Sequence, residues 1–294
     1  MLPCQGVFTS DYHQKTQERR KGRIDHVCRL LGPFNRSEFL SDRSQRKRLH
    51  HIFVIPEFNV VFCSVPKVSC TNWKRLFSVI SGHIQNYGQI GDPHRFFRQH
   101  FRRLSSLGAD DIARVLDTHT TFMFARNPYT RLLSAFMEKI EYQPGGRLPH
   151  QIYRWLLRNR PEIVTPNTSD LLTFDQFLTF YTDSVMEKNE HWQDMHELCF
   201  PCHIKYDFVG RYETLKPDAD YFMRFIGAPS NNEFPDPHKK PTYSSDRKTL
   251  LLKYSSVSDS QLQHLSQNPG LAVDLMLFGY SIPKCIQWQR KKSL

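Results

Sequence analysis

The segment Phe58–Ser81 constrains the fold of this 294-residue chain most, because it reads as a buried strand, a tight turn and an amphipathic helix. The stretch Val60–Val65 is nearly continuously apolar, which predicts a strand covered on both faces. Apolar residues then recur at helical spacing across Trp73–Ile80. A strand that leads into a helix presents unpaired backbone N–H groups and the positive end of the helix dipole. The turn is therefore either an anion site, most commonly for phosphate, or an ordinary strand–helix connection.

The side chains of this turn suit an anion, but not the phosphates of a nucleoside triphosphate. Lys67 adds a positive charge, and Ser69, Thr71 and Asn72 add polar groups. The turn contains no glycine and lacks the G-x-x-x-x-G-K-[ST] pattern. This departure argues against a mononucleotide kinase or a GTPase.

A second strand, turn and helix follow further along the chain. Thr120–Ala125 predicts a buried strand, after which Asn127 suits the helix N-cap and Pro128 the first helical position. The repetition predicts a parallel α/β sheet with ligands at the carboxyl ends of its strands. Arg126 and Ser134 could offer a guanidinium fork and a hydroxyl to a second phosphate. The alternative is a salt-bridged arginine and a core-facing serine.

The charge balance predicts a polyanionic partner. Lys and Arg number 40 against 29 Asp and Glu, a formal charge of +11, which suits nucleic acid, anionic lipid or an acidic polysaccharide. Residues 1–50 are polar and basic and predict a stem-like segment ahead of a domain at 51–294. The stem lacks the interleaved aromatic residues of a base-stacking platform, which argues against nucleic acid. No apolar run approaches the ~20 residues of a membrane span, and no signal peptide is visible.

Other stretches are less informative. Ile52–Ile55 and Asn59–Val65 predict two strands, joined as a hairpin through Pro56–Phe58. Residues 82–103 and 141–170 are polar and predict loops, whereas Tyr206–Gly210 predicts another short strand. The sequons at Asn35 and Asn167 matter only if the protein is luminal.

Seven cysteines are too few for a disulfide scaffold, and their odd number leaves at least one free thiol. The run Cys199-Phe-Pro-Cys202-His203 fits a c-type haem attachment, a zinc site completed by His196 and His203, or a redox pair. A structural role is the fourth interpretation.

Several longer motifs, in order, resemble one family. Val65–Arg75 resembles the 5′-phosphosulfate loop of Golgi carbohydrate sulfotransferases, and Phe124–Phe136 resembles their 3′-phosphate motif. Further blocks are similar to one branch, sulfotransferase family 2, which holds the chondroitin and dermatan 4-O-sulfotransferases, the N-acetylgalactosamine 4-sulfotransferases and the HNK-1 sulfotransferase. These blocks are Asn189–Gln193, Leu198–His203, Tyr206–Leu215 and Leu277–Ser281. Because the run Cys199–His203 lies in one of them, the resemblance favours a structural role for it, with Cys199 or Cys202 in a disulfide whose partner is not readable.

The resemblance implies a three-layer α/β fold with a central parallel sheet, like that of P-loop kinases. It also implies 3′-phosphoadenosine-5′-phosphosulfate (PAPS) as sulfate donor, with no metal. One loop would surround the phosphosulfate, and the second motif would hold the 3′-phosphate, with Arg126 and Ser134 in direct contact. The residues carried over to the donor are Pro66, Lys67, Val68, Ser69, Cys70, Thr71 and Asn72, and then Arg126, Asn127, Pro128, Tyr129, Thr130, Arg131, Leu132, Leu133 and Ser134.

For the chemistry, Lys67 is placed to stabilise charge on the leaving oxygen. A histidine is expected as general base, and the family places one between the first helix and the second strand. His94 is the first choice and His100 the second. His191 and Trp192 are expected to shape the acceptor cleft.

The acceptor implied by the resemblance is an anionic glycan, chondroitin, dermatan or a glycoprotein glycan, sulfated at the 4-hydroxyl of N-acetylgalactosamine. The alternatives are an HNK-1-type transfer to the 3-hydroxyl of glucuronate and a non-catalytic glycan-binding relative. Basic stretches such as Arg95–Arg103 and Arg154–Arg160 are expected to line the glycan groove or else to serve solubility. The family is anchored in the Golgi membrane as a type II protein, and this sequence shows no such anchor.

Overall fold

The computed structural model describes residues 10–164, 172–184, 189–229, 234–235, 242–284 and 286. The chain divides into two compact units, which are treated separately below. Unit 1 comprises Met1–Arg126, Met195–Pro237 and Leu277–Gly279, and unit 2 comprises Asn127–Asp194, His238–Met276 and Tyr280–Leu294. Among the described residues, no helix is both long enough and apolar enough to cross a membrane.

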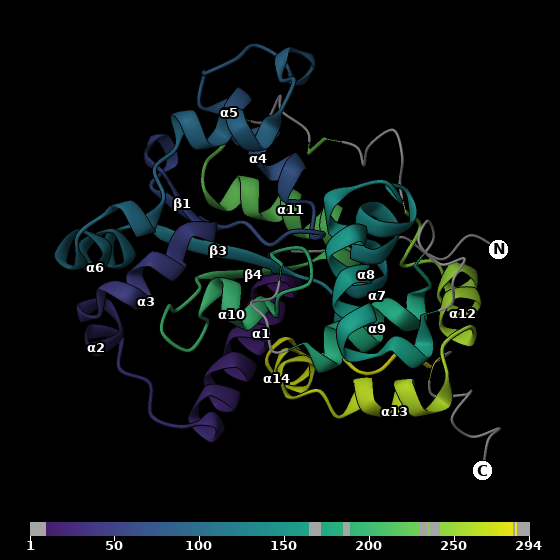
Figure 1. The fold of residues 1–294 in the computed structure, drawn as a ribbon. Helices are drawn as coiled ribbons and strands as arrows, with labels where there is room; N and C mark the ends of the chain where they lie inside the picture. Colours follow the sequence, from purple (N-terminus) through teal and green to yellow (C-terminus); the bar gives the residue numbers. More distant parts are fainter. Residues whose placement is uncertain are drawn as a thin grey trace, which may run out of the picture. The chain divides into compact units, whose positions relative to one another are not determined.

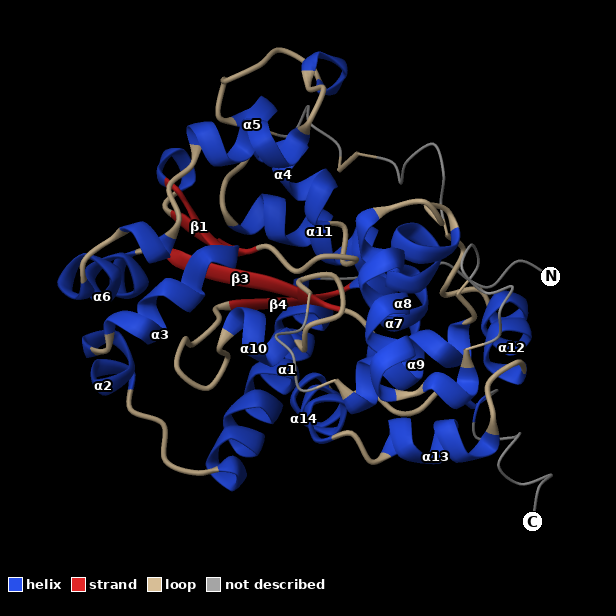
Figure 2. Ribbon diagram, in the orientation of Figure 1, coloured by secondary structure: helices blue, strands red, loops and turns tan. Residues whose placement is uncertain are grey.

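Unit 1 is built on a sheet whose described part has four strands in the order β1-β2-β3-β4. The strands are β1 (Ile52–Ile55), β2 (Val60–Cys63), β3 (Thr120–Ala125) and β4 (Phe208–Arg211). The first two form the predicted antiparallel hairpin, whereas β2, β3 and β4 run parallel. The mostly parallel α/β architecture expected from the repeated strand–turn–helix is therefore confirmed (Figure 2).

Helices cover both faces of this sheet (Figure 1). On one face, Trp73 of α4 (Cys70–Ile80) and Phe222 of α11 (Leu215–Phe225) pack against Phe122 of β3. On the other face, Cys63 of β2 is bonded to Cys199 of α10 (Met195–Cys199). Neighbouring residues of a strand point to opposite faces of the sheet. Phe62 therefore faces the layer of α4 and α11, and Cys63 faces the layer of α10.

The remaining helices of unit 1 lie before β1 or between β2 and β3, apart from two 3-10 turns, one between β1 and β2 and one after β4. They are α1 (Ser10–Leu31), α2 (Arg36–Ser41), α3 (Arg43–Arg48), α5 (Pro93–His100) and α6 (Ala109–Thr118), with the 3-10 turns η1 (Leu49–His51), η2 (Pro56–Phe58), η3 (Tyr87–Gln89), η4 (Leu104–Ser106) and η7 (Tyr212–Thr214).

The helix α1 packs on β4, although residues 1–50 are predicted to form a polar stem. Gln17 and Arg20 are buried, and both donate hydrogen bonds to the carbonyl oxygen of Val209. A disulfide joins Cys28 of α1 to Cys202. The division into 1–50 and 51–294 stays a prediction, but the helices before residue 50 fold as part of unit 1.

The described part of unit 2 is helical and has its own apolar core. Its helices are α7 (Pro128–Phe136), the π turn η5 (Met137–Glu141), α8 (Arg147–Asn159), η6 (Pro161–Ile163), α9 (Phe174–Asp183), α12 (Arg247–Ser255), α13 (Asp259–Ser266) and α14 (Pro269–Phe278), of which the last two residues belong to unit 1. The rings of Phe136, Phe174 and Phe177 pack together at its centre.

Two predicted loops are wrong in part, because each contains a helix. In the stretch 82–103, Asp92 caps α5 and Pro93 occupies its first turn. In the stretch 141–170, the paired glycines precede α8, and Pro149 lies in its first turn. A proline is tolerated there because the first backbone N–H groups of a helix have no intrahelical acceptor. Asp92 with Pro93, and Gly146 with Pro149, are thus helix-start signals within polar stretches.

A buried polar cluster fixes the N-terminal turn of α14 in unit 2. The Tyr181 hydroxyl donates to Asp194 at 2.9 Å, and burial next to this carboxylate raises the pKa of Tyr181 well above its ordinary value. A Cβ atom added at Gly270 would lie 2.1 Å from Oδ2 of Asp194. Position 270 therefore excludes any side chain as long as Asp194 keeps its place.

We expect Gly270→Ala to lower the free energy of unfolding by about 1–3 kcal/mol, because the new methyl group must displace a buried carboxylate. Urea titration followed by circular dichroism measures the loss. Gly22→Ala is the matched control, since a Cβ at Gly22 in α1 meets nothing within 4 Å. The control should be neutral or stabilising, as alanine favours helix. Equal stability of the two variants would contradict the packing of Asp194 on α14.

Candidate functional site

The carboxyl ends of the three parallel strands meet at one edge of the sheet in unit 1. Lys67 follows β2, Arg126 directly follows β3, and Tyr212 directly follows β4. Arg126 is buried, donates from Nη1 to the Lys67 carbonyl oxygen at 2.9 Å, and places its guanidinium carbon 4.0 Å from the centre of the Tyr212 ring. The arginine predicted to contact a phosphate therefore also braces the turn after β2 against the turn after β4.

The turn after β2 holds an unusual backbone conformation. Lys67 and Ser69 have φ values of 70° and 57°, in the left-handed region that favours glycine. For residues with a side chain this costs roughly 1–2 kcal/mol each. Ser69 is the N-cap of α4, and its carbonyl oxygen accepts from the N–H groups of Asn72 and Trp73. Strain of this kind is concentrated at sites where the backbone is shaped for a ligand.

His94, from α5, lies against this turn. Its Nε2 is 3.2 Å from Oγ1 of Thr71, and its Nδ1 is 3.0 Å from Nζ of Lys74. An ammonium group can only donate, so Nδ1 accepts from Lys74, and a neutral ring then carries its hydrogen on Nε2 and donates to Thr71. This tautomer is assigned from the partners. Lys74 is buried, with its Nζ 5.4 Å from the centre of the Phe53 ring.

His100 lies at the opposite end of α5 from His94. Its Nδ1 donates to the carbonyl oxygen of Phe96 at 2.9 Å, and its ring stacks on the Phe96 ring. The two histidines are six positions apart on the helix, about 9 Å along its axis. Of the two candidates for the base, His94 thus lies at the turn after β2, whereas His100 lies away from it.

Asn72 is also predicted to contact the donor, but its side-chain amide is hydrogen-bonded within the protein. It is 2% exposed, and its Nδ2 donates to the carbonyl oxygen of Pro235 at 3.1 Å. The neighbouring Trp73 ring packs on Phe234. Asn72 therefore ties the segment 234–235 to the start of α4. Pro66, Val68 and Cys70 are buried in the same turn, and Cys70 carries a free thiol.

The second predicted motif places Ser134 in unit 2, on α7. Ser134 is buried, and its Oγ lies 3.3 Å from Oγ1 of Thr242, which lies 2.8 Å from Oγ of Ser244. The three hydroxyls form a small polar cluster that could bind phosphate oxygens. Thr242 and Ser244 are absent from the sequence-based prediction, because in a polar loop nothing distinguishes them from their neighbours.

The other residues of this motif build the unit itself. Asn127 caps α7 by accepting from Tyr129 N–H, as predicted, and Pro128 occupies the first helical position. Arg131 is buried and donates to the carbonyl oxygens of Gln193 and Glu190. It thereby holds the segment that contains the two expected acceptor residues. The buried positions of the motif are Pro128, Tyr129, Thr130, Arg131, Leu132, Leu133 and Ser134.

Within that segment, the backbone N–H of His191 donates to Oδ1 of Asn189. Trp192 is 3% exposed and packs edge-to-face on the ring of Phe177. Most of the Trp192 side chain is thus core, and only the remainder of it is available to a ligand.

The Cys199–Cys202 run is structural, as favoured from the sequence. Cys199 is bonded to Cys63, and Cys202 to Cys28, so neither thiol is available to haem, zinc or a redox partner. His203 stacks on the ring of Phe39, and burial lowers its pKa. Cys4 and Cys285 lie outside the described residues.

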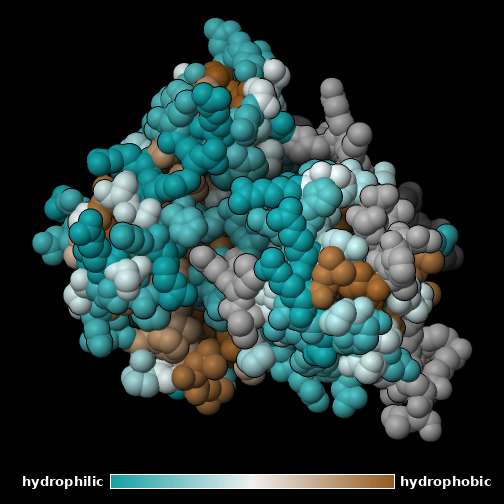
Figure 3. Space-filling model, in the orientation of Figure 1, coloured by the Kyte–Doolittle hydropathy of each residue, from teal (hydrophilic) through white to brown (hydrophobic). Residues whose placement is uncertain are grey.

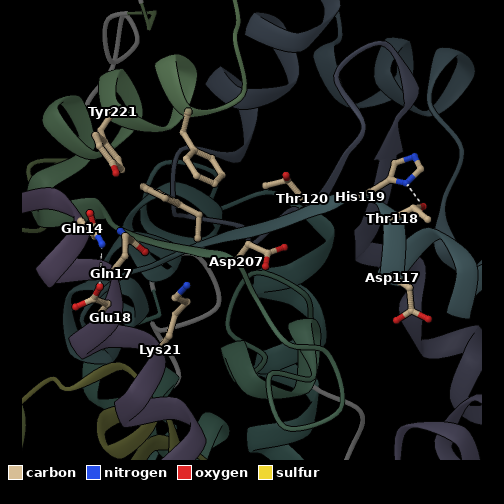
Figure 4. Close-up of a pocket in the computed structure, with 12 residues that line it drawn as sticks. Gln14, Gln17, Glu18, Lys21, Asp117, Thr118, His119, Thr120, Asp207 and Tyr221 are labelled. Atoms are coloured by element: carbon tan, nitrogen blue, oxygen red, sulfur yellow. Dashed lines mark hydrogen bonds between the residues drawn. The ribbon is translucent and has the colours of Figure 1, made fainter. Parts of the chain in front are cut away.

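Unit 1 also contains a cavity of about 560 Å³, which lies away from the Lys67 turn (Figure 4). Its lining includes Thr120 and Phe208, the first residues of β3 and β4, together with Glu18 and Lys21 of α1. It therefore opens at the amino ends of the parallel strands. Ligands of α/β sheets bind at the carboxyl ends, so this cavity is separate from the Lys67 turn.

A comparison of the sequence with models of known protein families agrees with the order of the motifs and with the geometry at the strand ends. The family model described as "Sulfotransferase family" matches residues 50–281. The chain belongs to the sulfotransferase family. It is 34% identical over 277 residues to carbohydrate sulfotransferase 14 of Danio rerio, covering 92% of this chain and 73% of that protein. No solved structure matches.

Two other relatives place the chain among carbohydrate sulfotransferases. Carbohydrate sulfotransferase 11 of Rattus norvegicus is 28% identical, with 92% of this chain and 77% of that protein covered. Carbohydrate sulfotransferase 9 of Homo sapiens is 30% identical, with 92% of this chain but only 61% of that protein covered. The sulfotransferase is thus a sulfate-transferring enzyme, and its family implies PAPS as donor.

Proposed function

We propose that this sulfotransferase moves sulfate from PAPS to a hydroxyl of an anionic glycan, most directly the 4-hydroxyl of N-acetylgalactosamine in chondroitin or dermatan. The observation that carries the proposal is the strained, glycine-free turn at Lys67, which Arg126 braces from the end of the next parallel strand. In the proposal, Pro66–Asn72 surrounds the 5′-phosphosulfate, and Arg126 and Ser134 bind the 3′-phosphate.

The transfer is an in-line displacement at sulfur. The acceptor oxygen forms the new S–O bond, the S–O bond to the 5′-phosphate breaks, and the acceptor proton passes to a base. The products are a sulfated sugar and adenosine 3′,5′-bisphosphate (PAP). Charge develops on the oxygen that leaves with the phosphate, so a preorganised cation at Lys67 and the first N–H groups of α4 favour the transition state.

His94 is our candidate for the base, with a condition set by its partners. With Lys74 donating to Nδ1, the hydrogen sits on Nε2, where no lone pair is available. His94 accepts a proton at Nε2 only if Lys74 releases Nδ1, for instance by turning toward the donor's sulfate. Donor binding would thereby activate the base.

Several features support an acidic glycan and a luminal location. The formal charge of +11 suits a polyanion. Two disulfides among the described residues are typical of proteins that fold in an oxidising compartment, which fits the Golgi lumen. The sequon residue Asn35 is exposed at the start of α2, and Asn167 lies outside the described residues.

The proposal is tested by incubating the purified protein with 35S-labelled PAPS and a panel of chondroitin, dermatan and glucuronate-terminated acceptors. We expect label in chondroitin or dermatan, at position 4 of N-acetylgalactosamine after disaccharide analysis. Label only in glucuronate-terminated acceptors would favour the HNK-1-type reaction. PAP binding without transfer to any acceptor would indicate a non-catalytic glycan-binding relative.

For the base, we expect His94→Ala to lower kcat by about 10²–10⁴-fold and to remove the acidic limb of the pH–rate profile. His100→Ala, on the same helix, is the matched control and should change kcat less than about twofold, because His100 bonds to its own helix. If His94 only orients Thr71 and Lys74, His94→Gln should keep most of the activity and the acidic limb. That outcome would remove His94 from the base role.

A further inference from the structure

Unit 2 contains a cavity of about 640 Å³ to which no step of the transfer has been assigned. Its lining comes from α8, from Phe180 of α9, and from Asn189 and Trp192 of the segment that Arg131 holds. Every lining residue that the structure describes belongs to unit 2. Figure 3 shows an apolar patch bordered by hydrophilic atoms on the visible face of unit 2, in the region of α7–α9.

One wall of the cavity is aromatic. The Trp155 and Phe180 rings meet edge-to-face with centroids 5.3 Å apart, and Phe180 and Trp192 meet in the same way at 6.4 Å. Trp192 is almost fully buried, whereas Trp155 is half-buried, so part of the Trp155 indole is available. An exposed indole face is apolar and carries the negative side of the ring quadrupole. It is suited to the C–H face of a sugar ring.

The rim next to this wall is basic. Arg154 and Arg158 are exposed and four residues apart on α8, so they lie on one side of the helix about 6 Å apart along its axis. Gln151 extends the same row. Among the described residues, the lining of this cavity contains no Asp or Glu, whereas the cavity of unit 1 is lined by Glu18, Asp117 and Asp207. A polyanion is therefore favoured in the cavity of unit 2 and disfavoured in the cavity of unit 1.

We propose that this cavity binds a segment of an anionic oligosaccharide, with one sugar ring on Trp155 and its carboxylate or sulfate groups on Arg154 and Arg158. The guanidinium groups bind such anions bidentately. The proposal deepens the glycan acceptor of the proposed function and rests on it. It assigns acceptor affinity to α8, apart from the residues that act on the donor.

The test uses a fluorescently labelled chondroitin octasaccharide, its carboxyl-reduced neutral form, and the full-length protein. Wild type should bind the charged form at least tenfold more tightly than the neutral form. Arg154→Ala/Arg158→Ala should remove this preference and raise KM for chondroitin at least tenfold, with kcat at saturation and PAP affinity unchanged. Trp155→Phe should weaken binding of both forms and reduce the change in tryptophan fluorescence on binding.

The matched control is Arg29→Ala/Arg114→Ala, which removes two exposed arginines of unit 1 that do not line the cavity. Equal binding and KM in the two double variants would overturn the site and show that only total charge matters. If Trp155→Phe weakened binding of the neutral form but not of the charged form, the indole would serve an apolar ligand. That result would also overturn the proposed site. If wild type shows the predicted binding pattern but transfers no sulfate from PAPS, the site stands and the proposed function fails.

Discussion

Replacing Lys67 with alanine is expected to reduce kcat for sulfate transfer by about 10²–10³-fold, the usual cost of losing one preorganised donor to a developing anion. Lys67 is half-buried in a turn that Arg126 fixes through the Lys67 carbonyl oxygen, so the backbone should keep its place without the side chain. Single-turnover transfer from labelled PAPS measures the chemical step directly.

Two comparisons make the Lys67 result specific. PAP affinity, measured by calorimetry, should fall much less than kcat, because the lysine interaction is expected to strengthen as the leaving oxygen gains charge. Lys15→Ala in α1 removes an exposed lysine and should leave both quantities unchanged. If Lys67→Ala lowered PAP affinity and kcat/KM equally while kcat stayed constant, Lys67 would be a binding residue only.

The sheet was predictable from the sequence because its strands are buried on both faces. Thr120–Ala125 is a strand over the residues expected, and β1 and β2 form the expected hairpin, since uninterrupted apolar runs leave few alternatives. The parallel pairing of β2 with β3 then places the turns after both strands at one edge. Parallel pairing alone therefore brings Lys67 close to Arg126.

The elements that the sequence did not reveal depend on polar or long-range contacts. The helix α1 has little apolar surface and is fixed to unit 1 by Gln17, Arg20 and the Cys28–Cys202 disulfide. The cysteine partners lie 174 and 136 residues apart, which no local pattern encodes. In α8, the preceding glycines obscured the helix that carries Arg154 and Arg158 on one side.

At the site, residue types were predictable but contacts were not. The sequence indicates Lys67 and Arg126 as polar groups near strand ends, and the resemblance to the family adds His94 as a candidate base. It does not indicate that Arg126 binds a carbonyl oxygen, or that His94 lies between Thr71 and Lys74. Lys74 was missed because one lysine within an amphipathic helix normally points to solvent, whereas the packing of α5 buries this one.

We expect Arg20→Ala to lower the free energy of unfolding by about 3–5 kcal/mol, because it leaves a buried carboxylate without its cation. Arg20 pairs with Asp218 at 2.8 Å, with side chains 8% and 4% exposed. Asp218 also accepts from the backbone N–H of Arg211, at the end of β4. The pair therefore connects α1 to the strand that leads to Tyr212. Urea unfolding of the full chain measures the effect.

Lys15→Ala is the matched control, since Lys15 lies on the same helix in an ion pair with Asp11 whose side chains are about 70% exposed. Its loss should change stability by no more than about 0.5 kcal/mol. The double variant Arg20→Met/Asp218→Leu should recover part of the stability, because it removes both buried charges together but leaves the N–H of Arg211 without its acceptor. If Arg20→Ala were as mild as Lys15→Ala, α1 would behave as a detachable stem, and the boundary at residue 50 suggested by the sequence would mark where the folded enzyme begins.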